Sequence, residues 1–127
     1  MDKLFLQQLT QLVALPSVSC TDPHIDQSNI AVIELLASWF SSMGFSCEIM
    51  PIAQGKANLI ATLGTGTGGL VLAGHTDTVP CDKQLWASDP FKVSERNGNL
   101  YGLGIADMKG FFPVVLNAAL AFSKSKL

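Results

Sequence analysis

Apolar residues recur at helical spacing in three segments of the chain. Residues 4–15 carry large apolar side chains every three or four positions, which predicts an amphipathic helix. A second helix is expected to follow Asp26 or Ser28, either of which can act as its N-cap, and Gly44 ends it. The third segment, residues 109–124, is nearly all apolar, so its helix is expected to be buried on most sides.

The remaining apolar runs are short and predict strands. Residues 45–51 and 57–63 have strand composition, and the run at 70–73 is bounded by glycine, which is typical of a buried strand. A further hairpin is expected to pair 91–95 with 100–101 across an Asn-Gly turn. Helices alternating with strands predict the α/β class, as a three-layer α/β/α arrangement with a twisted mixed sheet built from 45–51, 57–63 and 70–75.

Composition narrows the class of protein. The chain has 127 residues, 48% of them hydrophobic, which is enough for one packed domain. Lys and Arg number 8 against 10 acids, without a basic cluster, so no nucleic acid partner is expected. The start of the sequence lacks the basic region and the long apolar region of a signal peptide, and no apolar run approaches the ~20 residues that cross a bilayer, so we expect no membrane partner and a cytoplasmic location. Three cysteines without a C-x-x-C pair fit a reducing compartment.

The candidate chemistry lies where the 70–73 run ends. His75 and Asp77 are two residues apart, so in a strand their side chains would emerge on the same side. Imidazole is a good zinc ligand, and a carboxylate on its other ring nitrogen commonly holds the tautomer, a role that Asp77 could fill. Asp107, 30 residues later, can bridge two ions. A lone His-x-Asp is common by chance, but both acidic motifs are surrounded by glycine and follow apolar segments, which favours a metal site.

Competing interpretations of these motifs are weaker. The glycine run at 64–69 lacks the Gly-Lys-Ser/Thr ending of a phosphate loop and leads into a predicted strand, so it reads as a hairpin turn. The Gly-x-Gly turn ending at Gly104 begins like a dinucleotide fingerprint, but Asp107 replaces the third glycine and would repel a pyrophosphate. Cys81 is interpreted as a structural cysteine and His24 as a solvated loop residue.

Taken together, the motifs resemble those of a known enzyme family. Residues 72–80, then Trp86 with 89–91, then 100–112, are similar to the acetylornithine deacetylase branch of the di-zinc aminoacylase and exopeptidase family. The resemblance implies that His75 binds one zinc, that Asp77 is a catalytic residue whose carboxylate supports His75, and that Asp107 bridges two Zn²⁺ ions, for which Co²⁺ can substitute. It also implies a cis peptide between residues 107 and 108 and a zinc-exopeptidase-like catalytic domain.

The same resemblance implies that part of the machinery lies outside the sequence. The family's glutamate general base stands in a Glu-Glu pair on a later strand, and after Asp107 the chain has no Asp, Glu or His. We therefore expect residues 1–127 to be the N-terminal portion of a zinc-dependent catalytic domain, inactive alone, with the rest of that domain and a lid or dimerisation domain absent. The full-length parent is expected to be a homodimer.

The implied reaction is hydrolysis of a small N-acyl amino acid, N-acetyl-L-ornithine, to L-ornithine and acetate in arginine biosynthesis. Three alternatives stay open at this point: a succinyl-diaminopimelate desuccinylase, a related peptidase, and a non-catalytic α/β module derived from the same scaffold.

Overall fold

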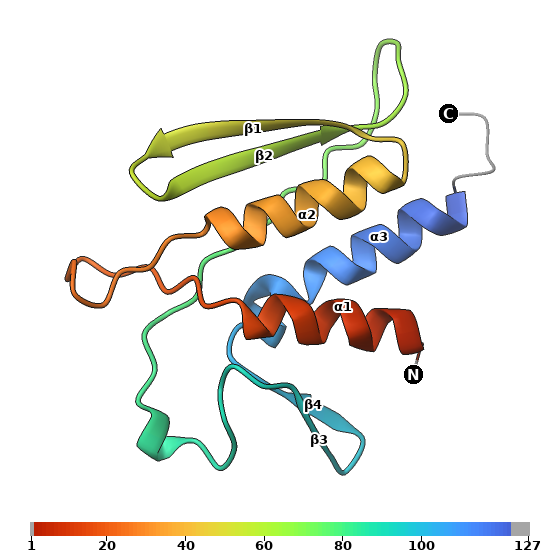
Figure 1. Ribbon diagram of the computed structural model, residues 1–127. Helices are drawn as coiled ribbons and strands as arrows, with labels where there is room; N and C mark the ends of the chain where they lie inside the picture. The colour runs from red at the N-terminus through yellow and green to blue at the C-terminus, as the bar shows by residue number, and fades with distance from the viewer. Residues whose placement is uncertain (1, 123–127) are drawn as a thin grey trace.

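The computed structural model describes residues 2–122, as three helices, two β-hairpins and two short helical turns (Figure 1). The helices are α1 (Lys3–Ala14), α2 (Ile30–Ser42) and α3 (Phe111–Phe122); the strands are β1 (Ser46–Ala53), β2 (Lys56–Thr62), β3 (Ser94–Arg96) and β4 (Asn99–Tyr101); the turns are η1 (Lys83–Leu85) and η2 (Ile105–Lys109). The β1–β2 hairpin lies along one side of α2, and α1 and α3 lie side by side on its other side (Figure 1).

The two N-terminal helices form where the sequence predicts them. The Asp2 carboxylate caps α1 by accepting a hydrogen bond from the amide of Leu4 at 3.1 Å. Asn29 occupies the N-cap position of α2 but makes no side-chain cap bond, and the neighbouring Ser28 hydroxyl instead accepts from the amide of Ile30 at 3.1 Å. Ser28 was one of the two predicted caps, so the start of α2 is set by local side-chain bonding as expected.

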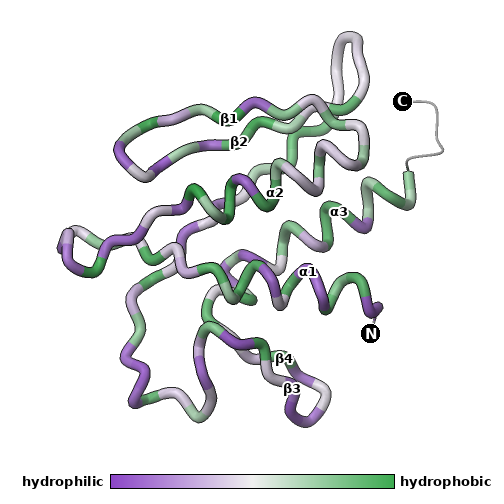
Figure 2. Tube along the Cα trace, in the orientation of Figure 1, coloured by the Kyte–Doolittle hydropathy of each residue, from purple (hydrophilic) through white to green (hydrophobic). Residues whose placement is uncertain are grey.

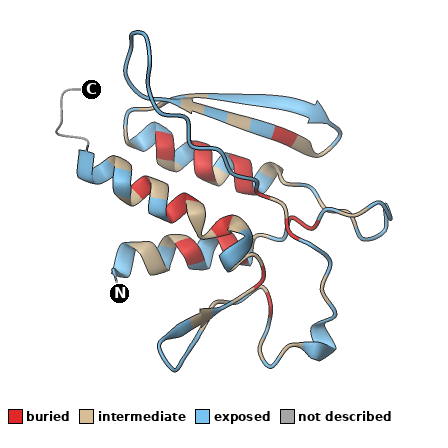
Figure 3. Cartoon of the chain, turned by 180° about the vertical axis from the view of Figure 1, so that it is seen from behind, coloured by how far each residue is buried: buried red, intermediate tan, exposed pale blue. Residues whose placement is uncertain are grey.

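A single hydrophobic core joins the three helices. Each helix buries apolar residues against the others (Figure 3), and in α1 and α2 the polar positions stay at the surface (Figure 2). The central cluster comprises Leu12, Val32, Leu36, Phe40, Phe112 and Leu116. Burying each of these side chains contributes about 1.5–3 kcal/mol. This core fixes α1 and α3 relative to one another.

The two hairpins confirm the strand predictions for four segments. Strands β1 and β2 pair antiparallel, with Ser46 opposite Thr62, and β3 and β4 pair across the predicted Asn-Gly turn. Both turn residues have positive φ, 54° at Asn97 and 74° at Gly98, which is the conformation that Asn and Gly adopt most readily.

The predicted strand at 70–75 is wrong for the part of the chain that the structure describes. Leu70 and Val71 are 82% and 89% exposed, and the run has no strand assignment. A strand needs a neighbouring segment that bonds to its backbone groups. Within residues 2–122, the first residue after Leu70 that forms a β-bridge is Thr78, which pairs in parallel with Val18. The α/β class is confirmed, but the described sheets are two separate antiparallel hairpins instead of one mixed sheet.

Helix α3 is less buried than its composition predicts. It buries Phe112, Pro113 and Leu116, whereas Val114 and Phe122 are 55% and 62% exposed. One face packs against α1 and α2, and among residues 2–122 no element covers the opposite face, so the prediction of burial on most sides is wrong here.

By length and composition alone, η2 and α3 together form one stretch, Ile105–Phe122, that is apolar enough to cross a membrane. Such a stretch is weak evidence, because core helices meet the same criterion. Non-helical backbone angles at Asp107 and Met108 interrupt it. The continuous helix that remains has 12 residues, about 18 Å against the ~30 Å of a bilayer core.

Candidate metal centre

His75 and Asp77 lie in an irregular segment that the α1–α2 loop holds in place. The amide of Thr78 donates to the carbonyl of Ser17 at 3.0 Å, and the carbonyl of Thr78 accepts from the amide of Ser19 at 2.9 Å. The buried Ser17 hydroxyl donates to the carbonyl of Thr76 at 2.6 Å. Asn29 adds a side-chain bond to the Thr76 hydroxyl at 3.1 Å. Loop contacts therefore provide the support that the sequence analysis assigned to a strand.

Asp107 lies in η2, a single π-helical turn between β4 and α3. The turn begins after Gly104, which has φ 77°, and the amide of Lys109 closes it by donating to the Gly104 carbonyl at 2.7 Å. A Cβ atom on Gly104 would lie 2.5 Å from Cγ2 of Thr78, so both the backbone conformation and the close approach require glycine. The Asp107–Met108 peptide is cis, as the family resemblance implies.

These two segments bring the three predicted residues together. His75 Nε2 lies 2.9 Å from Asp107 Oδ1, and His75 Nδ1 lies 3.1 Å from Asp77 Oδ1 and 3.2 Å from the Asp77 carbonyl oxygen. One carboxylate thus stands at each ring nitrogen. The side chains are accessible, at 47% exposure for His75 and 83% for Asp107. The expected proximity is observed, and the roles of these residues as metal ligands stay a prediction.

The two carboxylates change the proton affinity of the imidazole. Partial burial by itself lowers the pKa of His75, but the hydrogen bond to Asp107, the bond to the Asp77 carbonyl and the two negative charges outweigh it and raise that pKa above 6.5. Protons therefore compete with a metal ion for Nε2 more strongly than at an unperturbed histidine.

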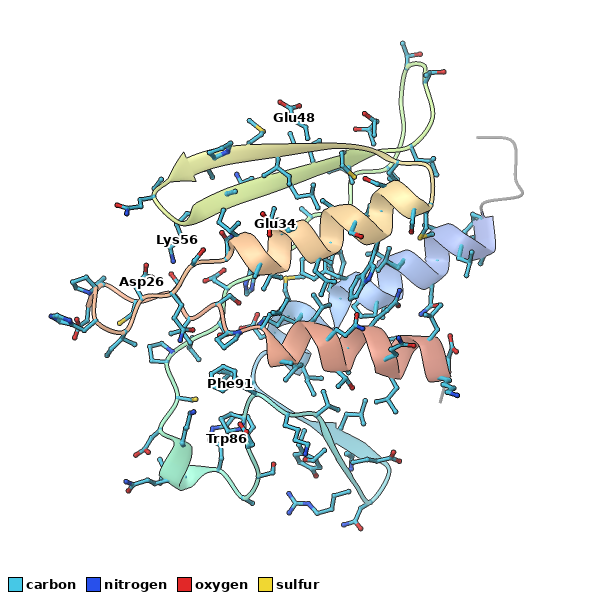
Figure 4. The ribbon with its side chains drawn as sticks, in the orientation of Figure 1. Asp26, Glu34, Glu48, Lys56, Trp86 and Phe91 are labelled. Atoms are coloured by element: carbon cyan, nitrogen blue, oxygen red, sulfur yellow. The ribbon has the colours of Figure 1, made fainter. Side chains whose placement is uncertain are left out.

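A pocket of about 250 Å³ opens in front of these groups. It is lined by His75, Asp77, Thr78, Val79, Trp86, Gly102, Leu103, Gly104, Ile105, Ala106 and Asp107. Most of this lining is backbone or apolar, so the imidazole and the two carboxylates are its only ionisable groups. Trp86 and Phe91 stand between η1 and the β3–β4 hairpin, where Trp86 forms one wall (Figure 4).

The donor set fits part of a zinc sphere. Imidazole nitrogen and carboxylate oxygen are zinc ligands, and a carboxylate behind the ligating histidine is the usual second partner. Two ligands cannot complete four-fold coordination, and within residues 2–122 no group of three or more His, Cys, Asp or Glu side chains is arranged to hold an ion. His24 is exposed in its loop, as predicted. Cys81 is a free, partly buried thiol, and its interpretation as a structural cysteine stays a prediction.

Sequence reasoning missed the residues that support this site. Ser17 and Asn29 carry no motif, because their partners are 59 and 47 residues away along the chain. Lys109 is 1% exposed, and its Nζ donates to two backbone carbonyls. One signal was available for it: a lysine directly before a long apolar helix must either leave the core or find acceptors inside it.

Comparison with known proteins agrees with the motifs. A family described as peptidase family M20/M25/M40 matches residues 71–127, the part that contains His75, Asp77 and Asp107. Over 125 residues the chain is 54% identical to acetylornithine deacetylases of Proteus mirabilis (strain HI4320) and Pasteurella multocida (strain Pm70), matches that cover 97% of the chain and 32% and 33% of those proteins. The chain thus spans about a third of the length of these curated relatives.

Among solved structures, human carnosine dipeptidase 1 is similar, with a TM-score of 0.75 and 27% sequence identity. The similarity covers 94% of this chain and 28% of that protein. The resemblance drawn from the sequence motifs is confirmed by these matches, and so is the α/β class of the fold.

Proposed function

Because this chain is related to the M20/M25/M40 peptidases, we propose that it provides one part of a di-zinc amide hydrolase. In this proposal His75 binds one zinc through Nε2, Asp107 bridges the two ions, and Asp77 is the catalytic support behind His75. The observation that carries the proposal is the placement of one imidazole between two carboxylates, 2.9 Å and 3.1 Å away, at the mouth of a pocket.

Each residue has a definite task in this arrangement. The Asp77 carboxylate favours a proton on Nδ1, which would leave Nε2, on the side of Asp107, as the nitrogen that binds an ion. Asp107, largely exposed, has a second carboxylate oxygen that the contact with His75 does not use. Bound zinc would supply Lewis-acid polarisation of the substrate carbonyl and a nucleophile at neutral pH. The general base and the remaining ligands would come from residues beyond position 127, so the chain alone is proposed to be inactive.

The proposed reaction is N-acetyl-L-ornithine plus water to L-ornithine plus acetate, an arginine-biosynthesis step in the cytoplasm. The 54% identity to two proteins named acetylornithine deacetylase supports this substrate over others. Co²⁺ is proposed to replace Zn²⁺, since both accept mixed nitrogen and oxygen donors. The complete protein is proposed to be a homodimer.

A second candidate, a dipeptidase, is favoured by the structural similarity to human carnosine dipeptidase 1 over 94% of the chain. Both reactions cleave a linear amide, and the described lining of the pocket has no charged side chain besides the candidate metal-site residues. A succinyl-diaminopimelate desuccinylase would use the same groups. A non-catalytic module is the further alternative, because residues 2–122 provide too few ligands for a complete site.

The protein expressed from its complete gene tests the substrate directly. It is assayed with zinc or cobalt on N-acetyl-L-ornithine, N-succinyl-diaminopimelate and β-alanyl-histidine. We expect the acetylated substrate to be hydrolysed fastest. Preference for either of the other substrates would replace the assignment, and metal binding without hydrolysis of any of them would favour the non-catalytic module.

A chimera tests the site residues separately. In it, this chain replaces the matching residues of the Proteus mirabilis relative, which supplies the rest of the protein. We expect deacetylase activity in the chimera and a loss of at least about 10²-fold for His75→Ala, because a ligand is removed. His24→Ala, the same change at the exposed histidine, should leave the rate unchanged. Equal rates for the two variants would contradict the assignment of His75.

A further inference from the structure

Both halves of the candidate centre are attached to the same short stretch of chain. We call residues 12–19 the support segment; it covers the last turn of α1 and the start of the following loop. The turn that carries Asp107 contacts its beginning, through bonds to Leu12 and Leu15. The strip that carries His75 contacts its end, through Ser17 and its neighbours.

Lys109 makes the first attachment. Its side chain is 1% exposed, and Nζ donates to the carbonyl of Leu12 at 3.1 Å and to that of Leu15 at 2.6 Å. Carbonyls in the last turn of a helix lack the usual i+4 partners, although that of Leu12 also accepts from the amide of Leu15 at 3.3 Å, and the helix dipole favours a cation there. No carboxylate among residues 2–122 forms an ion pair with this lysine. Its bonding capacity is therefore directed at the end of α1.

This attachment bears directly on Asp107. The carboxylate is 83% exposed, and in the described structure its only side-chain partner is His75. Nothing else holds the carboxylate, so its position depends on the backbone of η2 beneath it. Lys109 ends that turn, and its amide closes the turn onto Gly104. Fixing Lys109 to α1 therefore fixes the turn as a unit.

Ser17 makes the second attachment. Its side chain is 1% exposed, and its hydroxyl donates to the carbonyl of Thr76, the residue between His75 and Asp77. The bonds of Thr78 to Ser17 and Ser19 continue the contact on the far side of Asp77. The imidazole is thus located relative to the same backbone that receives Lys109.

We propose that Lys109 and Ser17 are positioning residues of the candidate centre, which hold Asp107 and His75 at a matched separation by anchoring both to the support segment. This inference rests on the proposed function for its consequence, which is metal affinity. A side chain that only caps α1 would affect stability alone. A positioning residue also sets the distance between ligands, and changes in such outer contacts typically weaken metal binding about 10–100-fold.

The test compares Lys109→Met and Ser17→Ala in the protein expressed from its complete gene. Lys109→Met keeps the length of the side chain and removes the donor. We expect it to bind Co²⁺ about 10–100-fold more weakly by titration, and Ser17→Ala to bind several-fold more weakly. Lys109→Arg keeps a cation and donors and should recover part of the affinity. The first control is Lys92→Met, the same change at an exposed lysine. The second is Phe40→Leu, which loosens the core at a residue that does not line the pocket.

A readout without metal separates this inference from the proposed function. In the metal-free protein, the NMR signals of the His75 ring report its contact with Asp107, and both variants should shift them while the controls do not. Folded variants that lose stability but keep wild-type Co²⁺ affinity and wild-type His75 signals would overturn the inference. If Lys109→Met does not fold, Ser17→Ala decides by the same criteria. A wild-type protein that binds no Co²⁺ would refute the proposed function, whereas the ring signals would still decide the positioning role.

Discussion

At the scale of single residues, the sequence alone identified the accessible side chains of the candidate metal centre, but it missed the buried and partly buried side chains that support them. His75, Asp77 and Asp107 stand out because acid and imidazole side chains next to glycine are unusual in apolar surroundings. Asn29 and Ser17 are ordinary polar residues whose importance comes from partners far away in sequence. The sequence assigned no role to Lys109, although it is one of the most buried side chains in the described structure and donates two bonds to backbone carbonyls at the end of α1.

The Asp77 carboxylate is expected to be required for metal binding as well as for turnover. In Asp77→Asn the negative charge beside His75 Nδ1 is lost while the size of the side chain is kept. We expect Co²⁺ affinity of the protein expressed from its complete gene to fall about 10–100-fold, because the imidazole becomes a poorer and less well oriented donor. Calorimetric titration measures the affinity. Asp22→Asn, in an exposed loop, is the control, and equal affinities in the two variants would argue against a supporting role for Asp77.

Lys109 predicts a pH dependence of stability. Burial lowers its pKa from 10.5 to about 8, so the unfolded chain binds more protons than the folded chain between these values. The free energy of unfolding should therefore rise as the pH increases from 8 to 10.5. The rise should be at most about 3 kcal/mol, since the carbonyl acceptors favour the charged lysine and so reduce the effect. Urea unfolding at several pH values measures it, as the difference between wild type and Lys109→Met. An identical pH profile for the two proteins would rule out this contribution.

At the scale of elements, helices and local hairpins followed from the sequence, and the apolar run at 70–73 did not. Helix periodicity and the Asn-Gly turn are local signals, and β1 pairs with a strand that begins three residues after its own end. A strand within a larger sheet depends on distant neighbours instead. The run at 70–73 has a strand-like composition, but no described strand pairs with it. Composition predicted burial, and the partner that would bury it is not among residues 2–122.

Gly104, the residue directly before the π-helical turn η2, should tolerate no side chain. In Gly104→Ala the new Cβ would meet Thr78 Cγ2 at 2.5 Å, and the residue would keep φ near 77°. We expect a loss of about 1–3 kcal/mol in unfolding free energy. The same shift would separate η2 from the Thr78 strip and weaken metal binding.

Gly98→Ala offers the matched control for that experiment. Its φ is also positive, at 74°, but nothing lies within 4 Å of the added Cβ, and the residue is in the β3–β4 turn. It should lose stability through backbone strain alone and keep wild-type Co²⁺ affinity. If Gly104→Ala bound Co²⁺ as well as Gly98→Ala does, the contact between η2 and Thr78 would not be needed for the site.

At the scale of the whole molecule, the described chain combines a well-formed core with apolar surface that has no cover. The core joins α1, α2 and α3, whereas the 70–72 run and one side of α3 are exposed. The family resemblance predicts that these residues contain only part of the catalytic site, because it places the general base outside them. Nothing in the sequence of 127 residues could say where the uncovered run would find its partner, since pairing is a property of both segments.

This uncovered surface should make the isolated 127-residue chain self-associate. The same chain should have no deacetylase activity, because the general base is proposed to lie beyond position 127. Contiguous apolar side chains are unfavourable in water, and Leu70 and Val71 expose 82% and 89% of their surface. Val71→Lys should shift sedimentation toward monomer, because a charge on an open backbone edge opposes strand pairing between copies. Val71→Ala is the control of smaller size without charge. A monomeric wild-type chain, or a wild-type chain that hydrolyses N-acetyl-L-ornithine as fast as the chimera, would show that the described residues form a self-sufficient unit.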